Sequence, residues 1–124
     1  MNKSFNNLED AYELCRKETQ QWAKTFYLGT LLLPYEKRRA IWAIYVWCRR
    51  TDELMDSSEA LKKSEEELSE SLNSWEENTK NIFKGIVKTD LDAVLADTLE
   101  KYPQNIDPYL DMIAGQRMDL TKFR

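Results

Sequence analysis

The sequence predicts an all-α helical bundle, and three observations support that prediction. Apolar residues recur every three or four positions in five segments, which is the periodicity of an amphipathic helix. No segment shows the alternating apolar and polar pattern of a half-buried strand. The 124 residues include three Gly and three Pro, so few positions favour turns over helices. The length suits one domain with a modest core.

The first helix is expected to begin after Asn7, a residue type that caps helices, and to run to about Lys24. The stretch TFYLGTLLLP then breaks the periodicity, and Gly29 loosens the chain before Pro34. The apolar side chains at helical spacing in this region are Leu8, Tyr12, Cys15, Trp22 and Phe26.

The second helix is expected to start at Pro34, where the missing N–H is not needed, and to continue through EKRRAIWAIYVWCRRTDELMD. Beyond its first turn this helix is apolar almost all round. Such a helix belongs in the middle of a larger bundle. Its apolar residues are Ile41, Trp42, Ile44, Tyr45, Val46, Trp47 and Leu54. Trp42, Trp47 and the later Trp75 are expected in the core.

The third helix lies in a polar region between Ser57 and Asn78. Ser64 and Glu67 have the spacing of a capping box. The apolar seam is thin, so this helix is expected at the periphery of the bundle. The seam consists of Leu61, Leu68, Leu72 and Trp75.

Two more helices follow. Thr89 and Asp92 cap the fourth, which Pro103 ends, and Asp107 followed by Pro108 opens the fifth. The helical pattern is still running at the last residue. Together with the almost entirely apolar second helix, this predicts that the 124 residues are part of a longer protein.

Composition excludes several classes of function. The net charge is −4, so the basic footprint of a nucleic-acid-binding protein is missing. The sequence has no His, which excludes Ser–His and Cys–His catalysis and any zinc site that uses His. Cys15 and Cys48 lie in apolar helical patterns and are expected to be buried free thiols, as in a reducing compartment.

No targeting or membrane-spanning segment is recognised. The N-terminus MNKSFNNLED has no apolar region of a signal peptide and no transit-peptide character. The apolar stretch 40–48 is far shorter than a membrane span. We expect a protein that is cytoplasmic or peripheral on a membrane. Its oligomeric state has no signature in the sequence.

Asp52 and Asp56 are the main candidates for function. They lie four positions apart and therefore share one face of the second helix, together with Arg49. These charged residues continue an apolar stripe that is expected to face the core. The stripe consists of Ile41, Tyr45 and Cys48. Charge in such a place needs a partner, usually a cation or a metal ion.

Two carboxylates at this spacing suit a hard divalent cation. Mg²⁺ binds a few carboxylate oxygens, keeps water ligands and completes its shell with substrate phosphates. An apolar helix face beside it would hold a hydrocarbon tail. The pattern therefore predicts a substrate with a diphosphate head, which the metal stabilises as it leaves an allylic carbon. The rings of Tyr45 and Phe26 would face the developing positive charge.

The competing interpretation is a solvated helix face, because acidic pairs at this spacing are common there. Arg49 would then pair with Glu53 or Asp52 in a surface salt bridge worth about 0.5 kcal/mol. The cluster 37–39 is expected to be a solvated first turn, with diphosphate contact as the minor alternative. Asp111 and Asp119 are expected to be surface residues or intrahelical partners, although Asp119 could reach a site.

The segment KTFYLGTLLLPYEKRRAIWAIYVWCRRTDELMD resembles the first signature block of the squalene/phytoene synthase family, in its cyanobacterial and plant form. DMIAGQRMDL resembles the motif on that family's following core helix. The resemblance covers roughly residues 8–124. It implies an isoprenoid synthase helical bundle and a head-to-head condensation of two geranylgeranyl diphosphates. The product would be phytoene, formed through prephytoene diphosphate in carotenoid biosynthesis, with Mg²⁺ or Mn²⁺ as cofactor.

The resemblance also implies roles for individual residues. The implied catalytic residues are Arg49, Asp52 and Asp56, with Arg49 contacting the diphosphate and the two aspartates binding the metal. The implied substrate-binding residues are Thr25, Phe26, Tyr45 and Asp119.

The family carries a second aspartate-rich motif on a later helix, which the sequence after Asp56 does not reach. Residues 1–124 are therefore expected to be the N-terminal part of a single isoprenoid synthase domain. We expect this chain alone to be unable to ionise its substrate; phytoene formed by it from geranylgeranyl diphosphate and Mg²⁺ would contradict this. Because substrate and product are lipids, peripheral membrane contact is expected.

Two alternatives remain open. One is an enzyme of the same fold that makes squalene or dehydrosqualene from farnesyl diphosphate. The other is a non-catalytic helical interaction protein built on this fold, which would be expected to lose the metal-binding aspartates.

Overall fold

The computed structural model describes residues 2–123, with side chains described for 8–121. Every regular element in this range is helical, which confirms the predicted all-α class. The elements are α1 (Asn2–Trp22), α2 (Lys24–Thr30), α3 (Tyr35–Asp56), η1 (Ala60–Lys62), α4 (Glu65–Phe83), α5 (Asp90–Lys101) and α6 (Asp107–Phe123).

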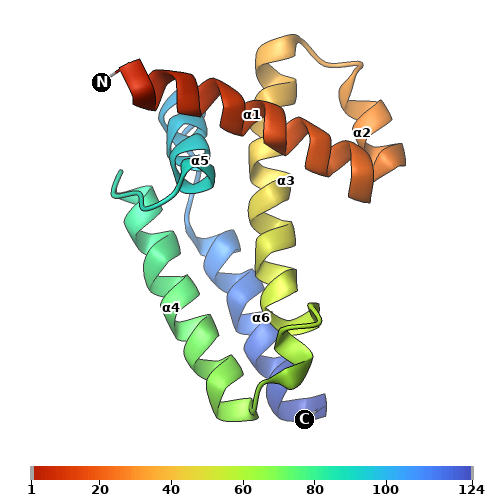
Figure 1. The fold of residues 1–124 in the computed structure, drawn as a ribbon, viewed down its shortest axis with the longest axis vertical. Helices are drawn as coiled ribbons and strands as arrows, with labels where there is room; N and C mark the ends of the chain where they lie inside the picture. The colour runs from red at the N-terminus through yellow and green to blue at the C-terminus, as the bar shows by residue number, and fades with distance from the viewer. Residues whose placement is uncertain (1, 124) are drawn as a thin grey trace.

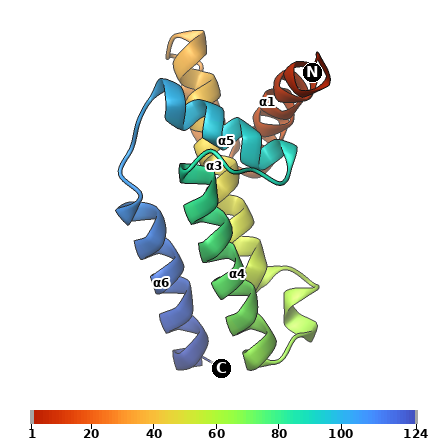
Figure 2. The ribbon, with the colours of Figure 1, turned by 90° about the vertical axis from the view of Figure 1, so that its left-hand side faces the viewer.

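Helix α3 is the centre of the bundle, as its apolar character predicts. Helices α1 and α5 cross its N-terminal half, whereas α4 and α6 lie along its C-terminal half (Figures 1 and 2). Helix α4 runs antiparallel to α3 and α6 runs parallel to it. The end of α3 that carries Asp52 and Asp56 therefore lies in the part of the bundle shared with α4 and α6.

Three tryptophans anchor the core, as predicted. Trp42, Trp47 and Trp75 are 3%, 2% and 9% exposed. Each indole N–H donates to a threonine hydroxyl, so none of these three buried donors lacks a partner. These bonds run from Trp42 to Thr30 (2.9 Å), from Trp47 to Thr79 (3.1 Å) and from Trp75 to Thr51 (2.7 Å).

The first two helices differ from the prediction. Helix α1 already begins at Asn2, so Asn7 lies inside it and is not its N-cap. The cost of Asn within a helix is below about 0.7 kcal/mol, which does not force a start there. Helix α1 ends at Trp22. After Ala23, the first part of the stretch expected to be irregular forms the short helix α2. Helix α3 starts one residue later than predicted, with Pro34 as its N-cap.

The burial of α3 corrects a second expectation. Its buried face carries Trp42, Ala43, Val46, Trp47 and Thr51, whereas the stripe of Ile41, Tyr45 and Cys48 is only partly buried. The stripe that leads to Asp52 is thus a partly exposed apolar surface at the edge of the core, against which Tyr45 and Cys48 pack. The reason is that α3 is apolar all round, so periodicity alone does not tell which face the other helices cover.

The basic first turn of α3 is also less solvated than predicted. Arg39 is 9% exposed, and its guanidinium carbon lies 3.9 Å from the centroid of the Tyr12 ring. Its Nη2 is 3.1 Å from a carboxylate oxygen of Glu9. Arg39 therefore joins α1 to α3.

The capping predictions for the later helices hold. The Glu67 N–H donates to Ser64 Oγ at 3.1 Å and the Ser64 N–H to Glu67 Oε1 at 2.9 Å, which completes the capping box. The Asp92 N–H donates to Thr89 Oγ1 at 3.1 Å. Leu61 does not join the apolar seam, because it lies in η1 and is 68% exposed.

The two cysteines are free, as predicted. Cys15 is 1% exposed, and burial raises the pKa of its thiol to about 12. Cys48 is partly buried. Within the described part of the chain, no helix has the length and hydropathy needed to cross a lipid bilayer.

Candidate functional site

Asp52 and Asp56 occupy the last two turns of α3 and differ in burial. Asp52 is partly buried and Asp56 is exposed. The amide Nε2 of Gln116, on α6, donates to Asp52 Oδ1 at 3.0 Å. Desolvation and the nearby charge of Asp56 raise the pKa of Asp52, and Arg49 partly offsets them. The protein alone thus stabilises the charge of Asp52 poorly, which is the condition in which a cation binds well.

Arg49 is held between an aromatic ring and a carboxylate. Its guanidinium carbon lies 3.8 Å from the centroid of the Trp22 ring, and its Nη2 is 3.2 Å from Glu53 Oε2. The predicted pairing with Glu53 is therefore present. The Nε of Arg49 is buried and has no hydrogen-bond partner. A buried donor without an acceptor is costly, and a phosphate oxygen is an acceptor that would satisfy it.

The other predicted substrate-binding residues are only partly brought together. The rings of Phe26 and Tyr45 lie 5.8 Å apart, centroid to centroid, and connect α2 to the partly exposed stripe of α3. Thr25 is exposed on α2 beside Phe26. Asp119 is exposed on α6, and the described contacts do not join it to the α3 aspartates.

An apolar hollow adjoins the carboxylates. It has a volume of about 280 Å³ and lies between α3 and α6. Cys48 and Met112 line it, and each stands one helical turn before a residue of the Asp52–Gln116 pair. The remaining lining residues are Ile44, Trp47, Gln104, Pro108 and Tyr109. A ligand with an anionic head at Asp52 would find an apolar surface for its tail here.

The donor set fits a magnesium ion that is only partly held by protein. Among the described residues, no group of three or more Asp, Glu, Cys or His side chains converges on one point. Asp52 keeps its Oδ2 free of described hydrogen bonds, and Asp56 accepts none within the same range. Two carboxylates with several outer ligands left to water or phosphate are what Mg²⁺ prefers.

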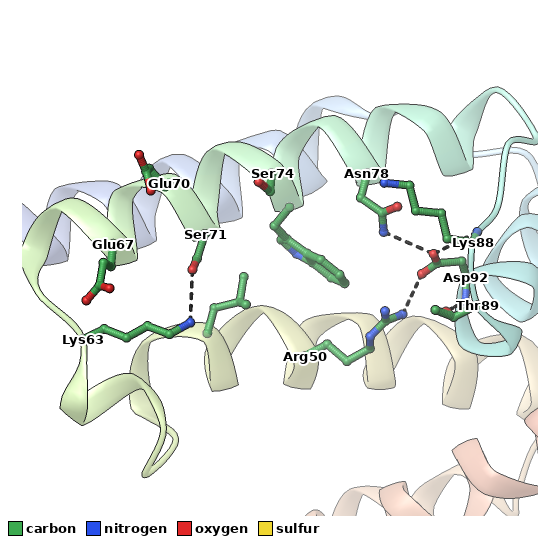
Figure 3. Close-up of a pocket in the computed structure, with 12 residues that line it drawn as sticks. Arg50, Lys63, Glu67, Glu70, Ser71, Ser74, Asn78, Lys88, Thr89 and Asp92 are labelled. Atoms are coloured by element: carbon green, nitrogen blue, oxygen red, sulfur yellow. Dashed lines mark hydrogen bonds and ion pairs between the residues drawn. The ribbon is translucent and has the colours of Figure 1, made fainter.

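A larger cavity, of about 570 Å³, lies on the opposite side of α3 (Figure 3). The polar side chains that line it serve to join helices. Arg50 Nη1 lies 3.0 Å from Asp92 Oδ1, and Asp92 is 1% exposed. Asn78 donates to the same carboxylate at 3.3 Å. The Arg50 guanidinium also stacks 4.6 Å from the centroid of Trp75. These contacts tie α3, α4 and the start of α5 together, and none of them approaches Asp52.

Two residues at the site were not predicted. Trp22 was assigned to the apolar face of the first helix, yet it is 52% exposed and covers Arg49. Gln116 had no assigned role. The sequence does hold a signal for it. Gln116 is a polar residue three positions after Ile113 and four before Leu120, so it falls on the same helix face as these two buried residues.

Comparison with known proteins agrees with this fold. The family described as "Squalene/phytoene synthase" matches residues 19–124. The 15-cis-phytoene synthase of Synechocystis sp. is 56% identical over 122 residues, which are 98% of this chain and 35% of the relative. The chloroplastic phytoene synthase of Daucus carota is 50% identical over 122 residues, which are 98% of this chain and 30% of the relative. The chain thus spans about a third of the length of these relatives.

A solved structure gives the same result. The squalene synthase HpnC from Alicyclobacillus acidocaldarius superposes with a TM-score of 0.80 at 25% sequence identity, over 93% of this chain and 41% of that one. The predicted isoprenoid synthase helical fold is therefore confirmed. On the strength of the family match over residues 19–124, this chain belongs to the squalene/phytoene synthase family.

Proposed function

We propose that this chain supplies the first diphosphate-binding half of a phytoene synthase, which condenses two geranylgeranyl diphosphates head to head. The observation that supports it most is the position of Asp52 and Asp56 at the end of a partly exposed apolar stripe and beside an apolar hollow. The high identity to phytoene synthases along the chain supports the choice of substrate and product. In this proposal residues 1–124 are the N-terminal part of one isoprenoid synthase domain.

The roles proposed for these residues are those that the family resemblance implies, and the surroundings of Asp52 and Arg49 support them. Asp52 and Asp56 hold Mg²⁺ or Mn²⁺, which when bound neutralises the charge that develops on the departing diphosphate. Arg49 donates from its unpartnered Nε to the diphosphate. Tyr45 and Phe26 face the prenyl chain with their rings, where they stabilise positive charge through their π faces.

Thr25 and Asp119 act at the edges of this site. Thr25 donates its hydroxyl to the diphosphate from the exposed side of α2. Asp119 orients the metal-bound diphosphate from α6. Because the substrate and the product are lipids, we propose that the protein makes peripheral contact with a membrane.

A chimeric enzyme tests the function. The segment of the Synechocystis phytoene synthase that matches this chain is replaced by residues 1–124, and the chimera is incubated with Mg²⁺ and either geranylgeranyl or farnesyl diphosphate. We expect phytoene from geranylgeranyl diphosphate and at least about a hundredfold loss of rate when Asp52 and Asp56 are both changed to Asn. A chimera that folds like the parent enzyme yet forms no phytoene would contradict the proposal.

The second candidate is synthesis of squalene or dehydrosqualene from farnesyl diphosphate. It is favoured by the similarity in fold to the squalene synthase HpnC. The same chimera decides between the two, because the second candidate predicts a C30 product and a preference for farnesyl diphosphate.

A further inference from the structure

We propose that Gln116 is a positioning residue for Asp52. Its side-chain amide holds one carboxylate oxygen so that the other is presented to the divalent cation. The inference rests on the proposed function, because it assigns a partner to the same metal site. It concerns a residue of α6, whereas the metal-binding aspartates belong to α3.

Gln116 lies on the buried face of α6. Tyr109, Ile113 and Leu120 form the buried stripe of α6 and are 6%, 0% and 6% exposed. Helical spacing places Gln116 in the middle of that stripe. A polar side chain in such a place is costly unless it finds a hydrogen-bond partner. Its partner is Asp52, at 3.0 Å.

The hydrogen bond between Gln116 and Asp52 involves one of the two carboxylate oxygens. Gln116 Nε2 donates to Oδ1 alone, so Asp52 Oδ2 remains free for a metal ion. A hydrogen bond to one oxygen fixes the plane of the carboxylate, which is the usual task of a residue behind a metal ligand. The donor is a neutral amide. A Lys or Arg in its place would neutralise Asp52 and compete with the cation.

The neighbouring residue, Arg117, joins α6 to α4. Arg117 Nη2 donates to Asn73 Oδ1 at 2.9 Å and to Glu76 Oε1 at 2.6 Å, both on α4. With Arg117 fixed towards α4, Gln116 is directed towards α3. Adjacent residues of α6 therefore contact two different helices, α4 through Arg117 and α3 through Gln116.

The experiment measures binding of Mn²⁺ to the 124-residue chain by electron paramagnetic resonance, with and without inorganic pyrophosphate. Gln116→Met removes the amide at nearly constant shape. Gln116→Asn keeps a polar side chain there but withdraws the donor by about one bond length, 1.5 Å. Both are expected to raise the dissociation constant for Mn²⁺ about tenfold. Gln21→Met, the same change at an exposed position of α1, is the matched control and should leave it unchanged.

A second measurement separates positioning from a merely structural role. In wild-type protein, Mn²⁺ should broaden the side-chain amide resonances of Gln116, which are identified by their loss in Gln116→Met. Circular dichroism verifies that both variants keep the helix content of the wild type.

The outcomes are distinct. If both Gln116 variants bind Mn²⁺ as the wild type does while Asp52→Asn does not, the role of Gln116 is refuted and the proposed function stands. If Asp52→Asn also binds Mn²⁺ like the wild type, both proposals fall. Unchanged Gln116 resonances in the presence of bound Mn²⁺ would also overturn the positioning role.

Discussion

The chain contains two helical pairs of aspartates with the same spacing, and only one of them lies in a setting suited to binding. Asp52 and Asp56 end α3, whereas Asp107 and Asp111 begin α6. Asp107 and Asp111 are both exposed and lie on the side of α6 away from its buried Tyr109 and Ile113. At a helix N-terminus, negative charge is already favoured by the helix dipole.

The two pairs share their spacing and differ in their surroundings. Asp52 has an amide from another helix, a nearby Arg49 and an apolar hollow one turn away. None of the described ion pairs involves Asp107 or Asp111. Desolvation destabilises the charged form of the Asp52 carboxylate, and a bound cation would stabilise it. The α6 pair needs no such relief.

The largest expected effect is on metal binding. Changing both Asp52 and Asp56 to Asn should weaken Mn²⁺ binding by more than about tenfold, since losses behind metal ligands alone reach that size. Changing both Asp107 and Asp111 to Asn is the matched control and should leave binding unchanged. Isothermal titration with Mn²⁺ and inorganic pyrophosphate measures both. Equal losses in the two double variants would mean that spacing, and not setting, makes the site.

A smaller effect is expected at the aromatic partner of Arg49. Trp22→Ala should weaken pyrophosphate binding in the presence of Mn²⁺ by about two- to fivefold, because an exposed cation–π contact contributes about 0.5–1 kcal/mol to holding the guanidinium. Trp22→Phe keeps a ring and should retain most of the affinity. The same titration measures both variants. If Ala and Phe behave alike, Trp22 does not position Arg49.

The contact between Arg117 of α6 and Glu76 of α4 should depend on pH. Hydrogen bonds from Arg117 and then Lys80 lower the pKa of Glu76. Its charge therefore stabilises the fold above the usual glutamate range, and the contribution is lost as pH falls through the lowered pKa. Glu76→Gln should cost about 0.5–1 kcal/mol at pH 7, and the difference from the wild type should shrink in acid.

Urea unfolding at several pH values tests this contribution. Glu77→Gln is the control, because Glu77 is the exposed neighbour of Glu76 on α4. If the loss in free energy of unfolding caused by Glu76→Gln stays the same at acid pH, where Glu76 is protonated, the charge of Glu76 is not its origin.

The smallest expected effect is a gain in stability. The pKa of Asp52 is raised by desolvation first, so its charge destabilises the folded state at neutral pH. Asp52→Asn should increase the free energy of unfolding at pH 7 by less than about 0.5 kcal/mol, because solvent screens a partly exposed group. The gain should vanish as pH falls below the usual aspartate range. Thermal unfolding beside Asp111→Asn measures it, and a loss of stability would contradict it.

Local sequence signals predicted much of the fold. The capping box at Ser64, the cap at Thr89 and the start of α6 at Asp107 follow from side-chain chemistry within a few residues. The burial of Arg39 does not, because it depends on packing between α1 and α3.

The same limit applies to the site. The spacing of Asp52 and Asp56 and the resemblance to the family pointed to the end of α3 as the candidate site. The expectation that the stripe before Asp52 is buried holds only in part, since its residues are partly exposed. Gln116 and Trp22 escaped notice because their importance lies in contacts across 64 residues of sequence in one case and between α1 and α3 in the other. Such contacts leave no periodic signal.

The pairing of buried indoles with threonine hydroxyls has a spectroscopic consequence. Trp42, Trp47 and Trp75 are buried and hydrogen-bonded, whereas Trp22 is half exposed and stacked on Arg49. Trp22 is thus the fluorophore that a soluble quencher reaches most readily. Fluorescence from this chain would report, without any label, when an anion binds to the Arg49 guanidinium that lies against this ring.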